Sequence, residues 1–222
     1  MEPQFWHERW TLNEIGFHQN HIHPQLIEHW PALGLAGGQV FVPLCGKSLD
    51  MAWLLRQGHA VLGVELSPLA VEDFFAEQAL AFASRRDGDF QVYEGAGIQL
   101  LCGDFFALEA KHLAGVQAVY DRAALIALPC DLQARYAEHL LAILPKRPPI
   151  MLITFEYDPS EMDGPPFSTP TQTVEALFGQ AYRIELLSSQ DLLDESPGLK
   201  SRGLSRLTEK AYRLSALPIT SL

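Results

Sequence analysis

Short apolar runs alternate with amphipathic stretches along most of the chain. The apolar runs have the length of buried strands, and the intervening stretches repeat their apolar residues at helical spacing. This alternation predicts an α/β fold in which a mostly parallel sheet of seven strands is covered by helices. We expect these strands at residues 39–43, 60–66, 98–102, 116–121, 150–155, 181–188 and 204–214.

Capping and stop signals predict where the helices begin and end. Ser67 is a good N-cap, and Pro68 suits the first helical position that follows it. Gly58 and Pro145 each follow an amphipathic stretch and are typical of the residues that end a helix. Helices are therefore expected over residues 3–33 with an interruption at Gly16, over 46–57, from Pro68 through Phe82, over 131–144 and over 171–179.

The second half of the chain contains one long expected loop. Residues 156–170 hold four prolines and a glycine, a composition that excludes a regular element there. Only a short, turn-bearing segment at 190–203 joins the last two expected strands, which favours an antiparallel pair at the edge of the sheet. With 222 residues, of which 48% are hydrophobic, the chain can bury one large core. We therefore expect a single domain over residues 1–222.

Charge and cysteine content narrow the choice of partners and compartment. Acidic residues outnumber basic residues by 27 to 16, giving a net charge of −11, so we expect no nucleic-acid partner. No stretch resembles a signal peptide or a membrane span, and we expect no membrane partner. The three cysteines include no CxxC pair, which argues against disulfides and structural zinc. The expected location is the cytoplasm.

The sequence PLCGKS at residues 43–48 follows the first expected strand, where open α/β sheets bind their ligands. A phosphate-binding P-loop would need a glycine at the position of Phe41, and a dinucleotide fingerprint would need two glycines in addition to Gly46. The loop therefore suits a ligand without phosphates. Cys45 is interpreted as a packing residue and Lys47 as a surface residue of the following helix.

Glu65 ends the second expected strand, about 20 residues beyond the first strand. A carboxylate at this place can accept hydrogen bonds from two ribose hydroxyls. S-adenosylmethionine contains a ribose and no phosphate, so this acid without a phosphate loop favours it over a nicotinamide cofactor. The alternative is that Glu65 is a solvated acid at a strand end.

Other polar residues near strand ends carry weaker hypotheses. Asp104 is placed to meet an adenine amino group or to cap a helix. Asp121 and Arg122 form a charged pair after the fourth expected strand, or a local ion pair with each other. The spacing of His21 and His23 is not that of helical metal ligands, and we expect no metal site.

Five segments, in order along the chain, resemble the thiopurine S-methyltransferase family. They are FWHERWTLNEIGFHQ (5–19), FVPLCGKSLDMAWL (41–54), GHAVLGVELSPLAVEDFF (58–75), YDRAALIALP (120–129) and FEYDPSEMDGPPFS (155–168). The resemblance implies a class I S-adenosylmethionine-dependent methyltransferase, a Rossmann-like fold with a seven-stranded, mostly parallel sheet and helices on both faces. It also implies that residues 1–36 form a helical segment covering the cofactor.

Four residues fall on the positions where the family contacts its cofactor. The resemblance implies that Trp10 closes over the sulfonium and carboxylate end, and that Leu44 lies under the methionine portion. It further implies that Glu65 holds the ribose and that Arg122 borders both cofactor and acceptor. As a cation, Arg122 would also favour an anionic thiolate acceptor.

The same resemblance places Phe17, Tyr157 and Phe167 in the acceptor pocket. Animal members carry a second substrate-facing arginine towards the C-terminus. Our alignment finds none at that position, although Lys200 and Arg202 lie nearby. This departure concerns the choice of acceptor more than the reaction.

The expected function is therefore methyl transfer from S-adenosylmethionine to the sulfur of thiopurines or other small aromatic or heterocyclic thiols. We expect a monomeric detoxifying enzyme with a small-molecule thiol as its partner and no dedicated general base. One alternative is a methyltransferase for selenium or tellurium species. Another is a catalytically silent domain that only binds the cofactor, and a nicotinamide oxidoreductase is disfavoured by the missing glycines.

Overall fold

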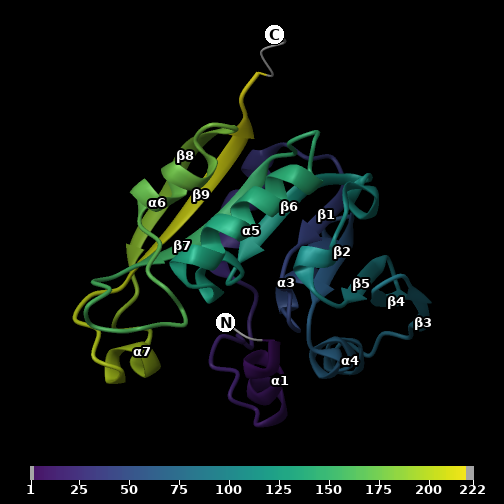
Figure 1. Cartoon of the computed structure of the whole chain (residues 1–222), viewed down its shortest axis with the longest axis horizontal. Helices are drawn as coiled ribbons and strands as arrows, with labels where there is room; N and C mark the ends of the chain where they lie inside the picture. Colours follow the sequence, from purple (N-terminus) through teal and green to yellow (C-terminus); the bar gives the residue numbers. More distant parts are fainter. Residues whose placement is uncertain (1–2, 219–222) are drawn as a thin grey trace. The chain divides into compact units, whose positions relative to one another are not determined.

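The computed structural model describes residues 3–218 (Figure 1). The chain forms two compact units, Met1–Tyr120 and Asp121–Leu222. The boundary falls inside one strand, β6 (Val116–Arg122), and each unit has its own strands and covering helices. No helix within residues 3–218 is long and apolar enough to cross a membrane.

Four parallel strands form the centre of the first unit. In space their order is β5 (Ile98–Cys102), β2 (His59–Glu65), β1 (Gly38–Val42) and β6. Most of their side chains are buried, as expected for parallel strands covered on both faces. The four predicted strands of this half and their parallel pairing are confirmed to within a residue or two.

An antiparallel hairpin that the sequence analysis missed extends this sheet beyond β5. It consists of β3 (Ala83–Asp87) and β4 (Phe90–Gly95), which turn at Gly88 with φ of 56°. All five residues of β3 are exposed, so the strand has no buried face to produce an alternating pattern. The two-residue connection Gly88-Asp89 is nevertheless a recognised hairpin signal.

Helix α4 (Pro68–Glu77) begins as predicted, with the Ser67 hydroxyl accepting the Ala70 N–H. The prediction that it continues through Phe82 is wrong, because Ala79 adopts φ of 52° and ends the helical path. Phe82 still packs against this helix from the irregular segment before β3, where its ring centroid lies 4.9 Å from that of Phe75.

The N-terminal segment contains two helices separated by irregular chain. Helix α1 (Pro3–Thr11) and helix α2 (Pro24–His29) are confirmed, and α2 continues into the 3-10 helix η1 (Trp30–Leu33). Residues 12–23, predicted as helical apart from Gly16, are not helical. Asn13 turns the chain with φ of 55°, and His23 is extended because it precedes a proline.

Helix α3 (Leu49–Arg56) starts later than the predicted residue 46. The Ser48 hydroxyl accepts the Asp50 N–H and so acts as the N-cap. Residues 43–48 form an irregular loop between β1 and α3 instead of a first helical turn. Two 3-10 helices, η2 (Phe105–Ala107) and η3 (Ala110–Leu113), connect β5 to β6.

The second unit contains an antiparallel three-stranded arrangement. Strand β9 (Thr208–Ala216) lies between β7 (Ile150–Glu156) and β8 (Tyr182–Asp191), and it is antiparallel to both (Figure 1). The predicted antiparallel edge is therefore confirmed. The described residues contain nine strands instead of the predicted seven, because the β3–β4 hairpin adds two.

Helices and one long loop complete the second unit. Helix α5 (Cys130–Ile143) and helix α6 (Thr171–Phe178) match their predictions, whereas the short helix α7 (Pro197–Ser201) was not predicted. The 3-10 helix η4 (Leu125–Ala127) precedes α5. Residues 157–170, between β7 and α6, are irregular as expected.

Candidate active site

Glu65 joins the ends of two neighbouring parallel strands. Its Oε2 accepts the backbone N–H of Gly46 at 2.8 Å, and its Oε1 accepts the backbone N–H of Ser67 at 2.8 Å. Gly46 belongs to the loop after β1, and Ser67 caps α4 after β2. The carboxylate is only 6% exposed, so the alternative of a freely solvated acid is wrong.

Two opposing effects act on the Glu65 carboxyl. Burial raises its pKa, and the backbone N–H groups of Ser67, Gly46 and Leu66 oppose that rise by stabilising the charged form. An ionised carboxylate offers about four acceptor sites. Beyond these backbone N–H groups, the carboxylate therefore keeps acceptor capacity for a ligand.

The loop after β1 has an unusual backbone that keeps it close to the sheet. Leu44 and Gly46 adopt φ of 43° and 51°, and such a conformation is uncommon for a leucine. The N–H of Cys45 between them donates to the carbonyl of Val64 at 3.0 Å. Left-handed non-glycine residues concentrate at functional sites, which fits the role proposed for Leu44.

Trp10 is packed onto this loop from helix α1. Its side chain is 5% exposed, and a Cβ built on Gly46 would lie 3.1 Å from Trp10 Cζ2. The ring of Phe17 meets Trp10 edge to face, with centroids 5.5 Å apart. The structure thus brings together four residues that the sequence associates with ligand binding: Trp10, Phe17, Gly46 and Glu65.

Lys47 differs from its expected placement and connects the loop after β1 to helix α4. It was expected on a helix surface, yet it is only 8% exposed and lies before α3 begins. Its Nζ donates to Glu77 Oε1 at 2.6 Å and to Asp73 Oδ2 at 3.2 Å. These two acids are four residues apart, so both lie on one face of α4 and can hold one ammonium group.

Two other candidates near the loop have structural roles. The interpretation of Cys45 as a packing residue is confirmed, because its thiol is buried against Gly63. Burial, and then the charge of Glu65, raise the pKa of this thiol well above its ordinary value, so it is not an activated nucleophile. Asp104 caps η2, with Oδ1 accepting the Phe106 N–H at 2.9 Å.

Asp121 and Arg122 at the end of β6 belong to the second unit. The alternative of a local ion pair between them is wrong, because the Asp121 carboxylate accepts the Tyr136 hydroxyl at 2.7 Å and the Leu125 N–H at 3.1 Å. Ala123 then turns the chain with φ of 61°. Arg122 is half-buried, and no residue in the described part of the chain forms an ion pair with its guanidinium.

Asp121 predicts a specific pH dependence of stability. Burial raises its pKa from 3.8 to about 6, despite hydrogen bonds that act in the opposite direction. The folded-state pKa of Asp121 is higher than its unfolded-state value. The contribution of protonated Asp121 to the free energy of unfolding is therefore fully present below pH 3.8 and is lost as pH rises through 6. The loss amounts to roughly 3 kcal/mol.

We expect Asp121→Asn to remove this pH dependence, because the amide does not ionise. Urea denaturation between pH 4 and pH 7 should show the wild-type free energy of unfolding falling relative to that of the variant as pH rises. Parallel profiles for the two proteins would contradict the raised pKa. Asp131→Asn, an exposed acid in the first turn of α5, is the matched control.

The acceptor candidates of the second unit lie in the loop 157–170. Tyr157 is 6% exposed, and its hydroxyl donates to the Pro166 carbonyl at 2.6 Å, so it supports the loop from within. Phe167 is half-buried and packs on Gly164, where an added Cβ would meet its ring at 2.6 Å. The N–H of Phe167 donates to the Ile126 carbonyl at 2.6 Å.

Sequence reasoning missed the residues that hold these loops. Nothing in the local pattern indicates that Lys47 reaches Asp73 and Glu77, which lie 26 and 30 residues further along the chain. The available signal was the i, i+4 spacing of these two acids on a predicted helix. That spacing does not identify their partner, because Lys47 lies outside the helix.

Comparison with known proteins agrees with the resemblance seen in the sequence. The family model described as Thiopurine S-methyltransferase (TPMT) matches residues 1–216. A protein of Methylococcus capsulatus named Thiopurine S-methyltransferase is 54% identical over 97% of this chain and 98% of its own length. One of Nitrosospira multiformis with the same name is 52% identical over 96% and 98%, respectively.

Solved structures show the fold. A Burkholderia thailandensis 1,6-didemethyltoxoflavin-N1-methyltransferase with bound S-adenosylhomocysteine matches with a TM-score of 0.61 and 18% identity, covering 96% of this chain and 87% of that one. An Anabaena variabilis SAM-dependent methyltransferase matches with a TM-score of 0.62 and 14% identity, covering 97% and 95%. The predicted Rossmann-like methyltransferase fold is confirmed, and the chain belongs to the thiopurine S-methyltransferase family.

Proposed function

We propose that this protein transfers the methyl group of S-adenosylmethionine to the sulfur of thiopurines or other small aromatic thiols. Family membership over nearly the whole chain supports the reaction. The observation that carries the cofactor assignment is the buried Glu65 carboxylate, which lies at the end of β2 and keeps acceptor capacity beyond its bonds to backbone N–H groups. The adjoining loop lacks the glycines of a phosphate site, which fits a ligand with a ribose and no phosphate.

The residues of the first unit fit this cofactor in chemistry as well as in position. Glu65 would accept the ribose hydroxyls, and Leu44 would support the methionine portion. Trp10, held against Gly46, would offer an aromatic face to the sulfonium. Bound there, S-adenosylmethionine supplies an electrophilic methyl group on a sulfonium sulfur. The chain's own contribution is to hold and orient the reactants.

Methylation of an aromatic thiol depends more on a cation near the sulfur than on a general base. An aromatic thiol is acidic enough to lose its proton to solvent, so no side chain has to remove it. Arg122 is a half-buried cation and would stabilise the thiolate, which lowers the pKa of a bound thiol. Phe17, 36% exposed, and Phe167 offer aromatic surface to a flat acceptor, while Tyr157 supports the loop that carries Phe167.

A panel of acceptors tests the proposal. We expect turnover of 6-mercaptopurine and of substituted thiophenols, with Arg122→Gln lowering kcat/KM by about 10-fold, or roughly 1.4 kcal/mol of transition-state stabilisation. Thiols with higher pKa should suffer most, because they depend most on the cation. Arg206→Gln, which changes an exposed arginine, is the control. Arg122→Gln with unchanged kcat/KM for every thiol would contradict the proposed role.

The same panel separates the alternatives. Methylation of selenium or tellurium species without methylation of thiols would favour metalloid chemistry. Binding of S-adenosylmethionine without transfer to any acceptor would favour a silent cofactor-binding domain.

We also propose that the protein works as a monomeric, cytoplasmic detoxifying enzyme without a nucleic-acid partner. Its net charge of −11 supports the last point. We propose further that residues 1–222 are one methyltransferase domain, since the family match runs through both units, and that residues 1–36 cover the cofactor. The packing of Trp10 onto Gly46 supports the role of the N-terminal segment.

A further inference from the structure

The loop 157–170 is held together at its base. The N–H of Thr169 donates to the Phe155 carbonyl at 2.7 Å, and the Ser168 hydroxyl bonds to both the N–H and the carbonyl of Tyr157, at 3.0 and 2.8 Å. The two ends of the loop are therefore adjacent. Compact loops whose ends meet and whose own side chains pack them are frequently functional.

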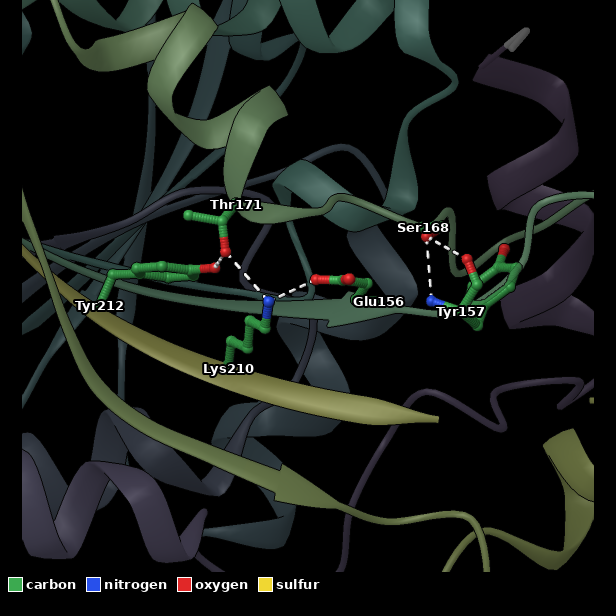
Figure 2. A network of polar contacts seen from close by, with 6 residues as sticks. All are labelled: Glu156, Tyr157, Ser168, Thr171, Lys210 and Tyr212. Carbon is green, nitrogen blue, oxygen red and sulfur yellow. Dashed lines mark hydrogen bonds and ion pairs between the residues drawn. The ribbon is translucent and has the colours of Figure 1, made fainter. Parts of the chain in front are cut away.

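Lys210 connects the residues on either side of this loop. Glu156 is the last residue of β7, and Thr171 is the first residue of α6, so the loop lies between them. The Nζ of Lys210 forms an ion pair with the Glu156 carboxylate and donates to Thr171 Oγ1 at 3.0 Å (Figure 2). Tyr212 adds a hydroxyl contact to the same Thr171 oxygen at 2.9 Å.

The ion pair between Lys210 and Glu156 is partly shielded from water. Lys210 lies on β9, the strand between β7 and β8, and its side chain is 15% exposed. Glu156 is 39% exposed, so the pair is less screened than two fully exposed charges. Hydrogen bonds from a charged donor are stronger than neutral ones, and one ammonium group can serve two acceptors.

Phe167 is the loop residue that this arrangement positions. It precedes Ser168, which bonds to Tyr157, and its own N–H donates to the Ile126 carbonyl. If the ends of the loop separated, the bonds at Ser168 and Thr169 would lose their geometry. The orientation of the Phe167 ring would then no longer be fixed.

We propose that Lys210 is a positioning residue for the methyl acceptor, acting through the loop 157–170. It holds Glu156 and Thr171 in place and thereby presents Phe167 to the thiol. The inference rests on the proposed function, because it takes Phe167 to be an acceptor-binding residue. In this role Lys210 acts through Glu156 and Thr171.

The test compares Lys210→Met, which keeps most of the length of the unbranched side chain and removes the charge, with Lys111→Met. Lys111 forms an exposed ion pair with Glu109 in the segment between β5 and β6. For Lys210→Met we expect KM for 6-mercaptopurine to rise about 5- to 10-fold, with kcat reduced less than 2-fold. The Kd for S-adenosylhomocysteine should stay unchanged, and amide hydrogen exchange should accelerate in residues 157–170. Lys111→Met should match the wild type.

Thr171→Val provides a second variant with nearly the same shape. It removes the hydroxyl that Lys210 and Tyr212 share, and we expect a smaller rise in KM in the same direction. Faster exchange in the loop with unchanged KM in both variants would overturn the proposal, because the contacts would then be structural only. Unchanged exchange in Lys210→Met would also overturn it.

Failure of the proposed function gives a different result. If the wild-type enzyme methylates no thiol, the proposed function fails. Amide hydrogen exchange, measured in the presence of S-adenosylhomocysteine, then reports whether 6-mercaptopurine binds. Protection of residues 157–170 in the wild type that is lost in Lys210→Met would still support the inference. Absence of protection in the wild type would refute it.

Discussion

Replacing Glu65 with alanine should weaken binding of S-adenosylmethionine by about 100-fold. The change removes the acceptor assigned to the ribose hydroxyls, and bonds to a charged group are worth about 1.5–3 kcal/mol each. It also leaves the N–H groups of Gly46 and Ser67, which Glu65 now accepts at 2.8 Å, without that partner. Titration calorimetry with S-adenosylhomocysteine measures the effect directly.

Two variants make this result specific. Glu65→Gln keeps the shape but replaces one accepting oxygen by a donor, so its affinity should fall between those of the wild type and Glu65→Ala. Glu138→Ala changes an exposed acid on α5 and should leave the affinity unchanged. A Glu65→Ala protein that is folded, as judged by its circular dichroism and its melting transition, yet binds as tightly as the wild type would rule out the ribose role.

Replacing Trp10 with alanine is expected to have the second largest effect. The indole is 5% exposed and packs on Gly46, so its removal should lower the free energy of unfolding by about 3 kcal/mol. Loss of its aromatic face should also reduce affinity for the sulfonium cofactor by about 10-fold, since a desolvated cation–π contact is worth up to about 2 kcal/mol. Chemical denaturation and cofactor titration measure the two effects separately.

Trp6 offers a matched control for Trp10. Both indoles meet the ring of Phe17 edge to face, at 5.7 Å for Trp6 and 5.5 Å for Trp10, but Trp10 is the one packed against Gly46. Trp6→Ala should therefore change cofactor affinity less than Trp10→Ala. Trp10→Ala should also show a weaker preference than the wild type for S-adenosylmethionine over S-adenosylhomocysteine, which lacks the sulfonium charge. An unchanged or stronger preference would contradict the cation–π contribution.

The parallel strands were predictable because burial on both faces gives each one a continuous apolar run. Strands β1, β2, β5 and β6 all appear within a residue or two of their predicted places. Ser67 and the proline after it also gave a correct helix start, because capping is decided by neighbouring residues. Local signals of this kind are present in a single sequence.

The remaining elements depend on contacts that a local pattern does not contain. Strand β3 is exposed throughout and is defined by its pairing with β4, so its own sequence carries no periodicity. Phe82 satisfied a helical spacing, yet it meets Phe75 from the irregular segment between α4 and β3. In both cases tertiary contacts decided the structure, and the local pattern did not contain them.

The candidate site likewise contains residues that could be predicted from the sequence and residues that could not. Glu65 and the loop after β1 follow from the rule that ligands bind beyond the carboxyl ends of parallel strands. The partners of Lys47 and Lys210 do not follow from any such rule. Lys210 and Glu156, for example, are separated by 54 residues and meet across two antiparallel strands. The pairing of Asp121 with Tyr136 instead of Arg122 was likewise decided by the packing of α5.

The central claim is that the chain moves a methyl group from S-adenosylmethionine to a thiol sulfur. The most direct measurement incubates the wild-type protein with S-adenosylmethionine carrying an isotopically labelled methyl group and with 6-mercaptopurine. Mass spectrometry then locates the label. We predict labelled 6-methylthiopurine with the label on sulfur, and much less of it with Glu65→Ala at cofactor concentrations that saturate only the wild type. Label on nitrogen, or no labelled product despite tight cofactor binding, would contradict the account.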